Sequence, residues 1–330
     1  MASLLFLSAT FLFLCNFFIS PELIYPTRID SLYVKYKAEV SSRFVQDDPE
    51  KVNQVYFNPL MLGMPYDDFN VTTHDSLQLK GWYIPSTDED ANTLLIIHDL
   101  SQSKLNYLNL MKQMHDRGLN VCAVDMRAHG NSEGVEFSLG TTSLADMKTI
   151  LDSLLRKNGT NRIAIFGAGI GAASAIQSAR FDGRSDALIL QSPFDNFSDY
   201  VNDYAKRKWN GMEFLLRAVL RRELEKRIQY DLSLLDMSEM ISEVDVPTLI
   251  ISGSNDEIVS PRFSKTVYEA SGAKKKKLYL VEKAEHQNIE LLGDEAYYNT
   301  ITEFIINSIP RKAKDTRFKK LALNDHEGHH

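Results

Sequence analysis

Short apolar runs alternate with segments of helical periodicity along most of the chain. In chain order the runs are LQLKGWYI, TLLIIHD, NVCAVDM, RIAIFG, DALILQS, PTLIISG and KLYLVEK. Residues 94–97 and 188–190 are apolar without interruption, as strands of a parallel sheet are when helices cover both of its faces. The pattern predicts an α/β fold with a doubly wound, mostly parallel sheet.

The alternation stops between about residues 195 and 242, where two helical segments follow each other with no strand between them. In the second segment an apolar residue recurs at every fourth position from Leu216 to Ile228, and three arginines lie off this stripe. We expect these helices to form a small cap over the carboxyl edge of the sheet, where open α/β sheets bind ligands. The arginines are expected to face solvent.

The first 25 residues differ from the rest of the chain. Residues 1–21 carry no charged side chain, and as a helix at ~1.5 Å per residue they would cover roughly 30 Å, about one bilayer core. They lack the basic start and the small-residue cleavage motif of a secretory signal. We therefore predict a membrane anchor or signal segment over residues 1–25, with secretion as the alternative. The side of the membrane stays open.

The remaining segments complete the predicted organisation. Residues 26–60 are mixed and polar without a strong period, and we interpret them as a stalk or linker. A single α/β domain is expected over residues 61–312, with the cap inside it. Residues 313–330 are charged and lack an apolar stripe, which predicts a flexible tail.

Composition excludes several classes of protein. The 330 residues have a formal net charge of −7, and a broad nucleic-acid surface would normally need a basic excess. The two cysteines, Cys15 and Cys122, lie in different environments, so a disulfide framework is not expected. No metal-binding spacing is found. We therefore expect no nucleic acid, no cofactor and no metal.

The stretch IAIFGAGIGAASAI, residues 163–176, allows two interpretations. Gly167, Gly169 and Ala172 match the glycine-rich loop of a dinucleotide site. Alternatively the stretch is a nucleophile elbow, G-x-S-x-G, with Gly169 in place of the serine. The dinucleotide interpretation requires an acidic residue at the end of the next strand, but Gln191 and Ser192 stand there, and at least three strands already precede the loop. The pattern favours the elbow.

Four further motifs accompany the elbow in order. They are IIHDLSQSK at 96–104, DMRAHGNSEG at 125–134, ISGSNDEIVSP at 251–261 and VEKAEHQN at 281–288. With these motifs the chain resembles the α/β-hydrolase superfamily over roughly residues 60 to 310, in particular its serine aminopeptidase-like and monoglyceride lipase-like branch. The resemblance implies hydrolysis of esters or amides by a serine hydrolase.

The resemblance also assigns roles to individual residues. Asp256 falls at the position of the triad acid and His286 at that of the triad base, while Gly169 falls at that of the nucleophile. The backbone N–H groups of Leu100 and Ile170 fall at the oxyanion hole. Serine needs an imidazole to take its proton, and the imidazole needs a carboxylate to fix its tautomer.

Two departures from the family pattern bear on this chemistry. Gly169 has no side chain, and Asp99 stands where the family has glycine, so a carboxylate lies beside an oxyanion-hole N–H group. Both changes oppose acyl transfer, and no other serine is expected to point at the base. His129, Asp125 and Arg127 are expected to support the site structurally.

Two hypotheses follow. In the first, the protein is a membrane-tethered pseudoenzyme. Its capped apolar pocket binds a lipid, acyl or peptide ligand or a partner protein, and it is lined in part by Tyr200, Tyr204, Trp209 and Phe214. In the second, a water molecule occupies the space that the missing side chain leaves and is activated by the acid and base pair. The protein would then be a residual hydrolase of small esters or amides. A gain of activity in Gly169→Ser would show that the remaining site is intact.

Overall fold

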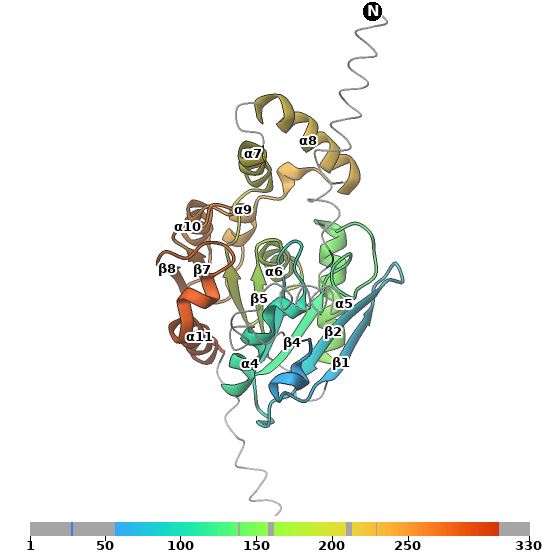
Figure 1. The fold of residues 1–330 in the computed structure, drawn as a ribbon, viewed down its shortest axis with the longest axis vertical. Helices are drawn as coiled ribbons and strands as arrows, with labels where there is room; N and C mark the ends of the chain where they lie inside the picture. Colours follow the sequence, from blue (N-terminus) through green and yellow to red (C-terminus); the bar gives the residue numbers. More distant parts are fainter. Residues whose placement is uncertain are drawn as a thin grey trace, which may run out of the picture.

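The computed structural model describes Arg28 and residues 57–137, 139–157, 162–208, 213–228 and 230–309. Its strands are β1 (Asp67–Thr72), β2 (Gln78–Ile84), β3 (Thr93–Ile97), β4 (Asn120–Asp125), β5 (Ile163–Ala168), β6 (Ala187–Gln191), β7 (Thr248–Gly253) and β8 (Lys276–Val281). They form one sheet in the order β1-β2-β4-β3-β5-β6-β7-β8 (Figure 1). The pairings of β2 with β1 and with β4 are antiparallel and the others are parallel. The predicted doubly wound, mostly parallel sheet is confirmed.

Helices cover both faces of the sheet. They are α4 (Leu108–Asp116), α5 (Thr141–Leu155), α6 (Ile170–Phe181), α7 (Phe197–Lys208), α8 (Glu213–Ile228), α9 (Met237–Ser242), α10 (Pro261–Ala270) and α11 (Ile289–Ser308), with short 3-10 turns η2 (Pro59–Leu62), η3 (Lys104–Tyr107) and η4 (Leu232–Leu234). Leu95 and Ile97 of β3 pack in a core with α5, α6 and α10, and Leu94 and Ile96 pack in a second core with α4 and α11. Side chains alternate between the faces of a strand, so an apolar run with no break fills both cores.

One strand was not predicted from the apolar pattern. β1 has the sequence DDFNVT, and only Phe69 and Val71 are buried in it. The strand lies at the edge of the sheet and pairs only with β2. Two buried side chains in six residues give too short an alternation to separate a strand from a loop.

The segment between β6 and β7 contains α7, α8, η4 and α9 and no strand, as the sequence predicts. In Figure 1, α7 and α8 lie at the top of the view, beyond one end of the strands. Leu220 and Leu224 of the predicted stripe are buried, while Arg217 and Arg222 are exposed. The small helical cap therefore buries the apolar face of α8 at these positions.

Several predictions fall on other parts of the chain. Residues 1–25 and 313–330 lie outside the described residues, as does the predicted stalk apart from Arg28 and residues 57–60. Within the described ranges, no helix has both the length and the apolar character needed to cross a bilayer. The anchor, the stalk and the tail stay predictions from sequence.

Candidate active site

The turn between β5 and α6 requires glycine. Gly169 joins the strand to the helix with φ of +50° and ψ of −111°, a conformation that side-chain-bearing residues rarely adopt. Two residues later, a Cβ atom on Gly171 would lie 2.3 Å from the carbonyl oxygen of Ile97. The bend is as sharp as an elbow, and its apex faces the loop that follows β3.

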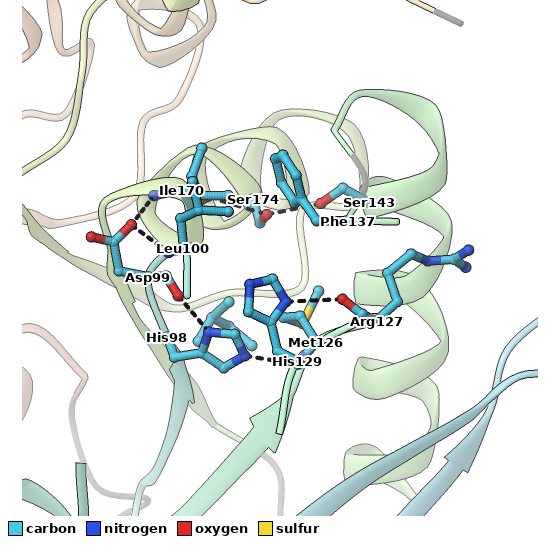
Figure 2. A pocket seen from close by; sticks show the side chains of 12 residues that line it. His98, Asp99, Leu100, Met126, Arg127, His129, Phe137, Ser143, Ile170 and Ser174 are labelled. Atoms are coloured by element: carbon cyan, nitrogen blue, oxygen red, sulfur yellow. Dashed lines mark hydrogen bonds between the residues drawn. The ribbon is translucent and has the colours of Figure 1, made fainter. Parts of the chain in front are cut away.

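The Asp99 carboxylate occupies the apex of this turn. Its Oδ1 accepts hydrogen bonds from the backbone N–H of Leu100 at 2.7 Å and of Ile170 at 3.0 Å (Figure 2). These are the two N–H groups that the resemblance assigns to an oxyanion hole. Its Oδ2 lies 2.8 Å from Nε2 of His286. One carboxylate thus contacts both donors and the imidazole.

His286 connects Asp99 to a second carboxylate. Its Nδ1 lies 2.7 Å from Oδ2 of Asp256, which also accepts a hydrogen bond from the hydroxyl of Ser192 at 2.8 Å. The other oxygen of Asp256 accepts from the backbone N–H groups of Ile258 and Val259, at 2.9 and 2.8 Å. The structure brings Asp256, His286 and the turn at residue 169 together, and both ring nitrogens of His286 face carboxylates.

The two carboxylates hold His286 in its charged form. Burial disfavours the imidazolium, but hydrogen bonds to Asp256 and Asp99 and their charges outweigh it and raise the pKa of His286 to about 10. Burial likewise opposes ionisation of Asp99, yet the hydrogen bond and charge of His286, with the two backbone N–H groups, hold its pKa below the ordinary value. At neutral pH both nitrogens of His286 therefore carry protons, and neither has a lone pair free to accept one.

The space beside Gly169 is filled. A Cβ atom built at this position would lie 2.0 Å from Oδ1 of Asp99 and 2.3 Å from its Cγ. A serine there would therefore require the Asp99 side chain to move away and break its hydrogen bonds. The sequence analysis placed a water molecule in this space, but the Asp99 carboxylate occupies it. We therefore do not expect Gly169→Ser alone to gain activity.

Two buried histidines hold the loop that carries Asp99. His98 donates from Nδ1 to the Asp99 carbonyl at 2.7 Å and accepts at Nε2 from the Met126 N–H at 2.9 Å. His129 accepts at Nε2 from the N–H of Ser101 at 3.2 Å (Figure 2 shows the two rings). Burial lowers the pKa of His98 to about 4 and that of His129 to about 3, so both rings are neutral. They fix the loop without adding charge.

Further ion pairs support the loop around residue 127. Arg127 pairs with Asp146 at 2.6 Å and with Asp75 at 3.0 Å, and Asp125 pairs with buried Lys104. Within the described part of the chain, one group of potential metal ligands gathers here. It consists of His74 and the two carboxylates that pair with Arg127, Asp75 and Asp146. The guanidinium of Arg127 already pairs with both of these carboxylates.

A cleft of about 700 Å³ leads to Asp99 and His286. Fifteen residues line it, and nine of them are polar or charged: Asp99, Ser101, Gln102, Asn106, Gln191, Arg207, His286, Gln287 and Glu290. Tyr200 and Tyr204 also line it, as the sequence suggested, whereas Trp209 and the side chain of Phe214 lie outside what the structure describes. The lining is more polar than the apolar pocket expected from sequence.

Sequence reasoning missed two features of the site. In the sequence, Ser192 was used only as evidence against a dinucleotide site. In the structure, its buried hydroxyl donates a hydrogen bond to Asp256. Asp99 was identified as a carboxylate beside an N–H group, but its contact with His286 was not foreseen. The sequence did contain a signal for the position of Asp99. Relative to the family pattern, residue 99 gains a side chain and residue 169 lacks one, which suggests that the Asp99 side chain fills the space left at residue 169.

The chain is similar in sequence to a known family. The sequence pattern of the serine aminopeptidase S33 family matches residues 88–234 and 233–290. YqkD of Bacillus subtilis is 27% identical over 234 residues, which cover 69% of this chain and 75% of YqkD. The α/β hydrolase domain-containing protein WAV2 of Arabidopsis thaliana is 26% identical over 275 residues, or 78% of this chain and 84% of WAV2.

The fold is similar to that of solved esterases. The structure of an esterase from Pyrococcus furiosus superposes with a TM-score of 0.64 at 22% sequence identity, covering 77% of this chain and 95% of the esterase. At this identity the likeness concerns the fold alone. The eight-stranded sheet and its flanking helices are those of an α/β-hydrolase.

Proposed function

The chain belongs to the serine aminopeptidase S33 family, and from that premise we propose that it lacks serine hydrolase activity and binds a small polar ligand in the cleft above Asp99. The observation that carries the proposal is the position of the Asp99 carboxylate. It takes up both oxyanion-hole N–H groups and the imidazole, which are the groups that a serine hydrolase uses on its substrate.

Acyl transfer meets two obstacles at this site. A carbonyl oxygen of a substrate would have to displace an ionised carboxylate from the N–H groups of Leu100 and Ile170. No hydroxyl stands at residue 169 to attack, and removal of one triad member already leaves only ~10³ to 10⁴ of rate enhancement from binding and the oxyanion hole. Here the oxyanion hole is occupied as well.

The alternative, a residual hydrolase that activates water, has weaker support. Its base would be His286, but the two carboxylates favour the imidazolium and raise the pKa of His286 to about 10. The water would also need the volume that Asp99 fills. Both observations argue against direct water activation on an ester or amide.

The test compares four proteins: wild type, Gly169→Ser, Asp99→Gly and the double variant. Each is treated with a fluorophosphonate probe, which labels activated serines, and assayed with p-nitrophenyl acetate. We expect no labelling and no turnover in wild type or in Asp99→Gly, because neither has a nucleophile. We expect none in Gly169→Ser, because the serine and the Asp99 carboxylate compete for one space, so that the hydroxyl, the N–H groups and His286 are not available together. The double variant restores the serine and frees the N–H groups, and it should gain labelling and esterase activity.

Two outcomes would contradict the proposal. One is turnover of the ester by wild type that disappears in His286→Ala. The other is activity in Gly169→Ser alone, which would mean that Asp99 leaves the turn readily. Circular dichroism of all variants separates loss of folding from loss of activity.

The ligand part of the proposal rests on the lining of the cleft. Amide side chains and tyrosine hydroxyls offer hydrogen bonds, while Ile258 and Ile289 supply only part of the wall. Such a surface favours a polar ligand over a long acyl chain, which would leave these groups without partners.

A further inference from the structure

The exposed side chains at the end of α7 and along α8 are almost all basic. Residues 204–228 carry eight basic and three acidic side chains, in a chain whose formal net charge is −7. Apart from Ala218, every described side chain that is exposed in this segment belongs to a lysine or an arginine: Lys206, Arg207, Lys208, Arg217, Arg222 and Lys226. We call these six side chains the basic face.

The acidic residues of the segment do not neutralise the part of the basic face that lies on α8. Glu225 is half-buried and pairs with Arg221, which is not a member of the face, at 2.8 Å. Among the residues that the structure describes, no carboxylate pairs with Arg217, Arg222 or Lys226. The positive charge of these three side chains is therefore open to an anion from outside the protein.

The apolar side of α8 faces the protein. Leu220 and Leu224 are buried, and among the described side chains of α8 only Ala218 is both apolar and exposed. The core of a protein interface is apolar and poor in charged residues, whereas an anionic lipid surface attracts basic side chains by charge alone. The basic face therefore fits lipid headgroups better than the core of an interface with a folded partner.

Arg28 attaches the N-terminal segment to the loop that follows β4. Its guanidinium donates to the carbonyl oxygens of Ser132 at 2.8 Å, of Gly130 at 3.5 Å and of Gly134. The membrane segment predicted from the sequence ends at residue 25, and the three residues from there to Arg28 span at most about 10 Å. A bilayer that holds this segment would lie within that reach of the loop.

The loop that binds Arg28 and the helices of the basic face lie at one edge of the sheet. The loop follows β4 and α7 follows β6, and the strands from β4 to β6 pair in parallel, so both segments leave carboxyl ends of strands. Figure 1 shows α7 and α8 beyond this edge. The two regions also approach each other, because a Cβ atom on Gly140, just before α5, would lie 2.7 Å from the ring of Tyr230, which follows α8.

We propose that the basic face docks the domain on an anionic lipid bilayer, with the cleft opening beside the lipid headgroups. Arg207 belongs to the basic face and also lines the cleft, so the mouth of the cleft borders the docked surface. Each basic side chain near an anionic bilayer contributes about a 5-fold gain in affinity, which salt screens. The proposal goes beyond the absence of serine hydrolase activity and does not depend on it.

The test measures how a bilayer shields lysines of the full-length protein. The protein is reconstituted into vesicles of phosphatidylcholine alone or with about a third of phosphatidylserine as the anionic lipid, and it is treated with sulfosuccinimidyl acetate, which does not cross membranes. Mass spectrometry compares acetylation of Lys226 with that of Lys274 in the same molecules. Lys274 is exposed and precedes β8, which pairs in parallel with β7, so it lies at the opposite edge of the sheet.

On the anionic vesicles, acetylation of Lys226 relative to Lys274 should fall at least about 5-fold, the effect of one basic residue at such a surface. Phosphatidylcholine alone should give no such fall, and salt at about 1 M, where the Debye length is about 3 Å, should abolish it. Equal ratios on the two kinds of vesicle would overturn the proposal. So would protection by soluble polyglutamate that anionic vesicles do not give, because it would assign the basic face to an acidic protein.

Two double variants separate the basic face from the net charge of the protein. Arg217→Glu combined with Arg222→Glu should return the acetylation of Lys226 to its value on phosphatidylcholine. Lys275→Glu combined with Lys277→Glu makes the same change of net charge at the opposite edge of the sheet and should leave the protection in place. Protection lost in both variants, or kept in both, would refute the assignment to the basic face. Circular dichroism checks folding, and the comparison of lipids in wild type decides even if a variant fails to fold.

Discussion

The steric conflict between residues 99 and 169 can be measured as a coupling energy. Gly169→Ala adds a Cβ atom that would lie 2.0 Å from Oδ1 of Asp99, and it also places a side chain at φ of +50°. The backbone strain costs about 1 to 3 kcal/mol. Moving Asp99 breaks its contacts with two N–H groups and His286, and each hydrogen bond to a charged group contributes about 1.5 to 3 kcal/mol, partly regained from water. We expect a total destabilisation of about 4 to 6 kcal/mol.

The same substitution should cost much less when the carboxylate is absent. In the Asp99→Gly background, Gly169→Ala meets only the backbone strain, so the two changes should couple by about 3 kcal/mol. Gly183→Ala is the matched control, because Gly183 has φ of +70° and no atom within 4 Å of an added Cβ. Urea unfolding of the four proteins in the cycle, followed by circular dichroism, gives the coupling. Additivity within about 0.5 kcal/mol would refute the conclusion that Asp99 fills the space of the missing side chain.

Three other predictions test the surroundings of the site and the chain terminus. Because the pKa of His286 is raised to about 10 from 6.5, its contribution to stability is complete below pH 6.5 and is lost as pH rises toward 10, with a slope of up to about 1.4 kcal/mol per pH unit. Urea unfolding of wild type and His286→Gln across this window should show the difference, and equal slopes would contradict it. Ser192→Ala removes the hydrogen bond to Asp256 and should lower the free energy of unfolding by about 1 to 3 kcal/mol, whereas a change below about 0.5 kcal/mol would mean that the contact is dispensable. When residues 1–25 are fused to a soluble reporter, the reporter should stay in carbonate-washed membranes. Leu12→Arg places an arginine in the segment, at a cost of about 2.5 to 3.5 kcal/mol at a bilayer centre, and should release part of the reporter. Equal retention of the two fusions would speak against a membrane-spanning helix.

The apolar pattern determined the architecture of this protein. Residues 94–97 of β3 are buried on both sides, and an uninterrupted apolar run is typical of a strand covered by helices on both faces. The absence of such a run between residues 195 and 242 likewise predicted the helical cap. These are local periodicities, and local sequence carries them. Strand β1 was not predicted, because its two buried residues, Phe69 and Val71, form too short an alternation.

The residue types of the site could also be identified from the sequence. Gly169, Asp256 and His286 follow strand-like runs in the order of the superfamily, and the carboxyl ends of parallel strands meet at one edge of the sheet. Their position along the chain therefore indicated that they would gather at that edge. What each would contact there depended on side-chain directions that chain order does not specify.

Only the tertiary structure decided the state of the site. Asp99 and His286 are 187 residues apart in the chain, and the contact between them depends on how the loop after β3 is held against the turn before α6. His98 and His129 hold that loop through hydrogen bonds to backbone groups that no sequence pattern marks. The sequence by itself determined that a carboxylate replaces glycine at one turn and glycine replaces serine at another. Packing between distant segments decided that the Asp99 carboxylate fills the space beside Gly169. The same packing places this carboxylate against His286, where it favours the charged imidazole.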